Sequence, residues 1–81
     1  MKSKQVFDVQ QDVVKGLQAA IERIYAKQLA ALPKDTSPQI AYFRAGGELL
    51  AEVTFYFPKS APVANFARRR GEWVMTRDWN D

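Results

Sequence analysis

The stretch QIAYFRAGGELLAEVTFYF, residues 39–57, decides the fold of this chain. Beyond Gly46-Gly47 the sequence alternates strictly, which is typical of a β-strand with one buried face. Two strands separated by Gly-Gly predict a two-residue hairpin, because both central residues of the favoured turn need positive φ.

This turn also predicts the register of the hairpin, since it pairs Ala45 with Glu48. The core face then holds three further pairs: Arg44 with Leu49, Tyr42 with Ala51, and Ile40 with Val53. On the other face Phe43 lies opposite Leu50, and Tyr56 follows on the second strand. This second face is more apolar than a fully solvated face needs to be.

Residues 6–33, VFDVQQDVVKGLQAAIERIYAKQLAALP, predict one long amphipathic helix. Its apolar stripe contains Val9, Val13, Leu17, Ala20, Ile21, Ile24 and Ala31, and we expect Ile24 to lie in the core. Asp8 with Gln11 forms a plausible N-terminal cap, although Ser3 could start the helix one turn earlier. Pro33 predicts an end near Ala31 or Leu32.

The segment PKSAPVANFARRRG, residues 58–71, has two interpretations. Ser60 as N-cap, Pro62 in the first turn and Gly71 as a stop favour a short helix near 61–70. A strand that turns at Arg70-Gly71 is the alternative. The next residues, EWVMTRDW at 72–79, alternate and predict a final strand.

The fold class predicted from these segments is α+β. One long N-terminal helix packs on a three- to four-stranded, mainly antiparallel meander sheet, with the short second helix near 61–70 as an addition. At 81 residues the chain has room for a single domain, residues 1–81.

The composition excludes most catalytic chemistry, because the chain contains no histidine and no cysteine. Ser-His and Cys-His nucleophile systems and the usual zinc sites are therefore absent. Glu48 and Glu52 share a strand but lie about 13 Å apart, too far for a paired acid and base. We expect no enzyme activity, no cofactor and no metal.

The same composition bears on the compartment. No apolar window is long enough for a signal peptide or a membrane span. The absence of cysteine favours a reducing compartment. We therefore expect a cytoplasmic protein with no membrane partner.

Two surface features could bind a macromolecule. Phe43, Leu50 and Tyr56 lie on the sheet face that one helix cannot cover, which favours a protein-protein binding or assembly module, with a homodimer as its simplest form. Arg68-Arg69-Arg70 with Trp73 nearby is the alternative, a nucleic-acid-binding surface. The net charge of +3 does not by itself indicate nucleic acid, and Trp73 also fits a core position.

Overall fold

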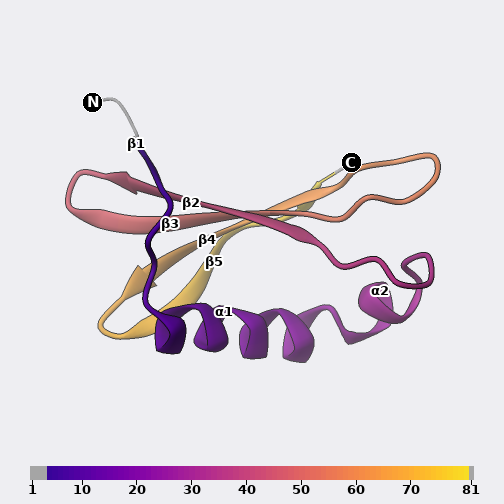
Figure 1. Cartoon of the computed structure of the whole chain (residues 1–81), viewed down its shortest axis with the longest axis horizontal. Helices are drawn as coiled ribbons and strands as arrows, with labels where there is room; N and C mark the ends of the chain where they lie inside the picture. Colours follow the sequence, from indigo (N-terminus) through magenta and orange to yellow (C-terminus); the bar gives the residue numbers. More distant parts are fainter. Residues whose placement is uncertain (1–3, 81) are drawn as a thin grey trace.

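The computed structural model describes residues 4–80 and has the α+β fold that the sequence predicts (Figure 1). Its elements in chain order are β1 (Lys4–Val6), α1 (Gln11–Ile24), α2 (Ala26–Ala30), β2 (Gln39–Ala45), β3 (Glu48–Thr54), β4 (Val63–Arg69) and β5 (Glu72–Asn80). The strands form one antiparallel meander in the order β1-β2-β3-β4-β5. The sheet therefore has five strands instead of the expected three or four.

The central hairpin has the predicted turn and register. Gly46 and Gly47 adopt φ angles of 59° and 78°, the left-handed region that favours glycine. Ala45 pairs with Glu48, and every further pair follows from that turn up to Gln39 with Thr54. Local turn chemistry was sufficient to specify this part of the fold.

Residues 63–69 form strand β4, so the short helix favoured for residues 61–70 is wrong. A backbone hydrogen bond closes the loop between β3 and β4: the N–H of Phe55 donates to Pro62 O at 2.9 Å. Ala64 and Phe66 are both buried on the side of the sheet that faces α1. Their spacing of two residues is the side-chain period of a strand. Arg70 and Gly71 make the turn into β5 with φ angles of 53° and 77°.

The N-terminal segment also differs from the expected helix start. Residues Lys4–Val6 form β1 along the edge of β2, and α1 begins only at Gln11. Gln10 is the N-cap without a side-chain hydrogen bond, so Asp8 does not cap the helix. Edge pairing satisfies backbone groups of β2 that would otherwise need water. Ser3, the alternative cap, lies outside the described residues.

The expected single helix is broken at Tyr25. This residue leaves the helical region at φ −116° and ψ 32°, and the short helix α2 follows. The break turns the Tyr25 side chain into the core, whereas Ile24 remains 38% exposed. The expectation that Ile24 is a core residue is therefore wrong, because the apolar stripe is continued by Tyr25 after the change of direction.

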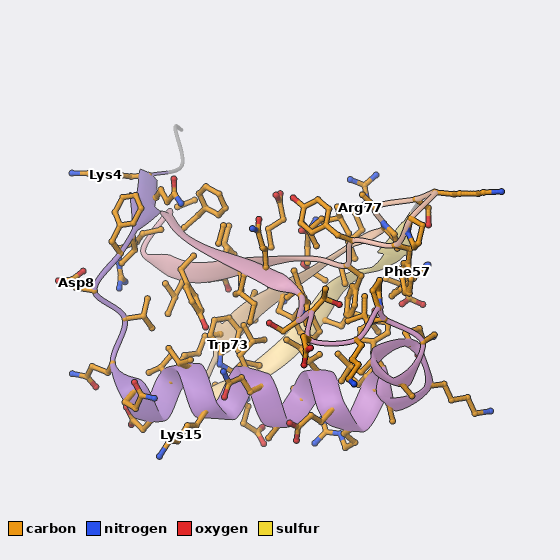
Figure 2. The ribbon with its side chains drawn as sticks, turned by 45° about the vertical axis from the view of Figure 1, so that its right-hand side comes forward. Lys4, Asp8, Lys15, Phe57, Trp73 and Arg77 are labelled. Atoms are coloured by element: carbon orange, nitrogen blue, oxygen red, sulfur yellow. The ribbon has the colours of Figure 1, made fainter. Side chains whose placement is uncertain are left out.

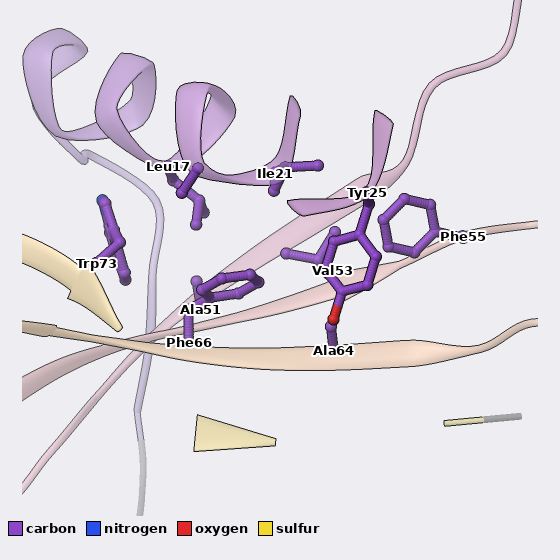
Figure 3. Close-up of a cluster of buried hydrophobic side chains, with 10 residues drawn as sticks. Leu17, Ile21, Tyr25, Ala51, Val53, Phe55, Ala64, Phe66 and Trp73 are labelled. Carbon is purple, nitrogen blue, oxygen red and sulfur yellow. The ribbon is translucent and has the colours of Figure 1, made fainter. Parts of the chain in front are cut away.

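The core lies between α1 and one face of the sheet, here called the helix-facing face. Figure 3 shows Leu17, Ile21 and Tyr25 directed from the helix toward Val53 and Phe66. Leu17, Val53 and Phe55 are completely buried. No helix lies over the opposite face, here called the outer face, within the described residues (Figure 1).

The two tryptophans lie at different ends of this core. Trp73 is buried as expected, and its indole N–H donates to Val13 O at 3.0 Å. Trp79 is half-buried, with its ring centroid 4.7 Å from that of Phe55 and 5.6 Å from that of Tyr25. It therefore packs within its own chain, over the C-terminal end of the helical segment.

Candidate protein interface on the outer face of the sheet

An apolar row crosses four strands of the outer face. Phe43 on β2 pairs with Leu50 on β3, Leu50 pairs with Ala67 on β4, and Ala67 pairs with Val74 on β5. Directly paired residues point to the same face, and adjacent strands are about 4.8 Å apart, so the row extends about 14 Å across the sheet. These four residues are called the outer-face row below.

The members of the outer-face row differ in size and exposure. Ala67 is completely buried among its neighbours, Phe43 and Leu50 are half-buried, and Val74 is 42% exposed. Large side chains thus occupy β2 and β3, and smaller ones occupy β4 and β5. The exposed apolar area of the row therefore comes from Phe43, Leu50 and Val74, while Ala67 lies below the surface between them.

Charged residues border the outer-face row on both sides. On the side of the hairpin turns, Arg69 Nε donates to Glu48 Oε2 at 2.6 Å, and Glu72 pairs with Arg69 across the strands. This hydrogen bond lowers the pKa of Glu48 and raises that of Arg69. On the other side are Glu52 and Arg77, and Figure 2 shows Arg77 directed away from the helix.

A shallow hollow of about 280 Å³ opens beside the row, next to Phe43, Leu50 and Thr76. It lies beside an irregularity in the pairing of β4 with β5. Asn65 pairs with Arg77 while Phe66 pairs with Met75, so Thr76 is an extra residue on β5. Such a bulge disrupts the ladder locally and re-aims side chains.

Two of the three residues predicted for the interface, Phe43 and Leu50, lie together at one end of the row. Tyr56 is 51% exposed but follows the end of β3, about 20 Å along the chain from Leu50. It therefore lies outside the outer-face row. Ala67 and Val74 were missed, and assigning residues 63–69 as a strand would have placed Ala67 opposite Leu50 and Val74 opposite Ala67.

The residues of the predicted nucleic-acid surface are close together, with Trp73 paired to Arg68, but they do not share one exposed face. Arg68 is on the helix-facing face, opposite Leu49, whereas Arg69 is on the outer face with Glu48. Arg70 is in the turn with φ 53°, and Trp73 is buried. Strand geometry thus alternates the arginines and removes the aromatic ring from the surface, so these residues do not form one basic stacking platform.

Within residues 4–80 there is no group of three acidic, histidine or cysteine side chains that could hold a metal ion. No described helix has the length and apolar character that a membrane crossing requires. Comparisons with protein-family models, curated proteins and solved structures find no significant match.

Proposed function

We propose that this protein is a non-enzymatic assembly module that forms a homodimer through the outer face of its sheet. The observation that carries the proposal is the outer-face row, an apolar stripe of four cross-strand neighbours that no helix of the described chain covers. Contiguous apolar surface bordered by polar residues is typical of protein interfaces.

The pattern of sizes along the row supports a second copy as the occupant. A two-fold axis parallel to the strands, between β3 and β4, places Leu50 over the partner's Ala67 and Phe43 over the partner's Val74. Each large side chain then lies over a strand position that holds a smaller residue, and both copies use the same patch, as an isologous interface requires. Shape complementarity of this kind is what gives an interface core its packing density.

The charges that border the row support the same axis. The rotation exchanges β3 with β4, so Glu48 of one copy faces the partner's Arg69, and the reverse contact forms as well. A rotation about the row itself would instead place Glu48 over the partner's Glu52. Opposite charges at the rim favour the first arrangement, because like charges brought together at an interface cost free energy.

Light scattering after size-exclusion chromatography tests the homodimer. We expect a dimer for the unmodified protein, and folded monomers for Leu50→Lys and Phe43→Glu, since each buries an unpaired charge in the interface. Phe7→Lys is the matched control, because Phe7 is an exposed aromatic outside the row. A monomer at roughly 1 mM for the unmodified protein would contradict the proposal.

Single cysteines test the axis, because the chain has no native cysteine. Phe43→Cys mixed with Val74→Cys should give a covalent heterodimer under mild oxidation, in higher yield than either variant alone. A rotation about the row would instead favour the Phe43→Cys homodimer. That result would contradict the proposed axis while leaving the interface itself in place.

A further inference from the structure

We infer that an open cavity at the N-terminal end of α1 binds a small organic phosphate. The cavity has a volume of about 880 Å³ and lies on the helix-facing side of the sheet. The segment between β1 and α1 forms one wall, and the ends of both hairpins form another. The lining residues that carry the inference are Lys4, Arg44, Arg68, Val9, Val13 and Leu49.

Three cations lie along one row of the sheet beside this cavity. Lys4 pairs directly with Arg44, and Arg68 lies across Leu49 from Arg44. The ion pair found within residues 4–80 is Arg69 with Glu48, and it involves none of the three. Like charges on directly opposite residues destabilise a sheet, so this arrangement costs free energy in the empty protein.

One carboxylate lies among the described residues that line the cavity, and two more, Asp12 and Glu72, share an adjoining hollow with Arg68. Asp8 is the single carboxylate among the described lining residues, and Figure 2 shows it directed outward from the N-terminal segment, as is Lys4. Gln10 and Val13 of the first turn of α1 also line the cavity, and no side chain caps that turn. The partial positive charge of the helix end therefore adds to the field of the row.

The chemistry of the walls indicates the class of ligand. Two guanidinium groups on strands about 10 Å apart suit a doubly charged phosphate, to which arginine donates hydrogen bonds in pairs. Val9, Val13 and Leu49 offer apolar surface for an organic body. The volume is within the range of about 300–1,000 Å³ that small-molecule pockets occupy.

The experiment uses the indole N–H signals of the two tryptophans in NMR spectra. Trp73 donates to Val13 O beside the cavity, whereas Trp79 packs at the other end of the core and is the internal control. Titration with adenosine monophosphate should shift the Trp73 signal and leave that of Trp79 in place. Adenosine, which lacks the phosphate, should shift neither.

Matched arginine variants assign the binding to the cavity. Arg44→Gln and Arg68→Gln should each weaken adenosine monophosphate binding by at least about tenfold, because each removes charge-assisted hydrogen bonds. Arg70→Gln, which lies in the β4–β5 turn, should leave the affinity unchanged. Arg44→Gln should also raise the melting temperature of the empty protein by relieving its repulsion with Lys4.

Four results would overturn the inference. The first is that adenosine monophosphate does not shift the Trp73 signal, and the second is that Arg70→Gln loses as much affinity as Arg44→Gln and Arg68→Gln. The third is that Arg44→Gln melts at a lower temperature than the unmodified protein when no ligand is present. The last is that inorganic phosphate binds as tightly as adenosine monophosphate. The second would mean a diffuse basic surface, and the last would mean that the organic body contributes nothing. Dimerisation through the outer face is a separate measurement, so neither proposal depends on the other.

Discussion

Tyr25, which is buried, and Tyr42, which is partly buried, show how one hydroxyl group can be satisfied and another left without a partner. Tyr25 OH donates to Asp78 Oδ1 at 2.7 Å and lies 3.1 Å from Met75 Sδ. Tyr42 OH is buried with no hydrogen-bond partner in the described structure, while its ring packs on Trp73. Burial raises the pKa of both phenols, and for Tyr25 the hydrogen bond to Asp78 adds to the effect.

Replacing each tyrosine with phenylalanine should therefore have different effects. Tyr25→Phe should lower the free energy of unfolding by about 1 kcal/mol, because a charge-assisted hydrogen bond is lost. Tyr42→Phe should be neutral or stabilising, since it removes a buried hydroxyl that has no partner. Urea unfolding at neutral pH measures both values, and a larger loss for Tyr42→Phe would contradict the assignment.

The pKa of Tyr25 predicts a loss of stability in alkali. Burial first, and then Asp78, raises this pKa from 10.0 to about 12 in the folded protein. As pH rises through 10.0 the unfolded chain loses the phenolic proton while the folded chain retains it, so unfolding is favoured. The contribution of Tyr25 to the free energy of unfolding is complete below pH 10.0 and is lost progressively as the pH rises to about 12.

Midpoints of urea unfolding measured from pH 8.5 to 11.5 test whether stability falls as the pH rises. The unmodified protein should lose stability more steeply above pH 10 than Tyr25→Phe does. Tyr56→Phe is the control, because the Tyr56 side chain is half exposed. Parallel curves for the unmodified protein and Tyr25→Phe would show that Tyr25 is not the titrating group.

At the scale of the elements, α1 contains a glycine that its packing does not require. Gly16 faces Trp73, and an added Cβ would lie 3.6 Å from Trp73 Cδ1, an ordinary van der Waals contact. Glycine within a helix costs about 0.5–1 kcal/mol relative to alanine, because it loses more backbone entropy on folding.

Gly16→Ala should therefore stabilise the protein by about 0.5–1 kcal/mol, which thermal or urea unfolding would measure. Gly71→Ala is the contrasting variant, since its φ of 77° in the β4–β5 turn is strained for alanine, and it should destabilise. Destabilisation by Gly16→Ala would mean that the helix and Trp73 are closer than described.

The same helix separates two apolar residues that look alike in sequence. Leu17 is completely buried, and Leu17→Ala should cost about 2–5 kcal/mol. Ile24 is partly exposed at the end of α1, so Ile24→Ala should cost less than about 1 kcal/mol. Equal losses in urea unfolding would place Ile24 in the core after all.

At the scale of the whole molecule, one core joins both ends of the sheet. The buried cluster contains residues of α1, β3, β4 and β5, and Trp79 packs against it from the C-terminal end. A small domain with one contiguous core is expected to unfold in a single cooperative step.

Single-tryptophan variants test this cooperativity. Trp79→Phe leaves Trp73 as a reporter near the N-terminus of α1, and Trp73→Phe leaves Trp79 at the other end. Within each variant, the fluorescence transition and the far-ultraviolet circular dichroism transition in urea should coincide. Separate midpoints would mean that one end of the core opens before the other.

The predictions made from sequence succeed where the deciding interactions are local. Gly46-Gly47 determines a turn, the turn determines the register, and the register places Phe43 beside Leu50 on the outer face. The burial of Trp73 follows from the same alternation on β5. Each of these steps links residues that are close in the chain, so backbone conformation and side-chain period are enough to predict it.

Only the tertiary structure decided the other features, because they depend on pairing between distant segments. Residues 63–69 carry helix signals, but hydrogen bonding to β3 and burial of Phe66 favour a strand. Lys4 meets Arg44 because the chain returns to the edge of β2, and Ala67 and Val74 complete the outer-face row only once β4 and β5 are paired. Strand partners far apart in sequence leave no local period, so the complete outer-face row and the row of three cations emerge only with the assembled sheet.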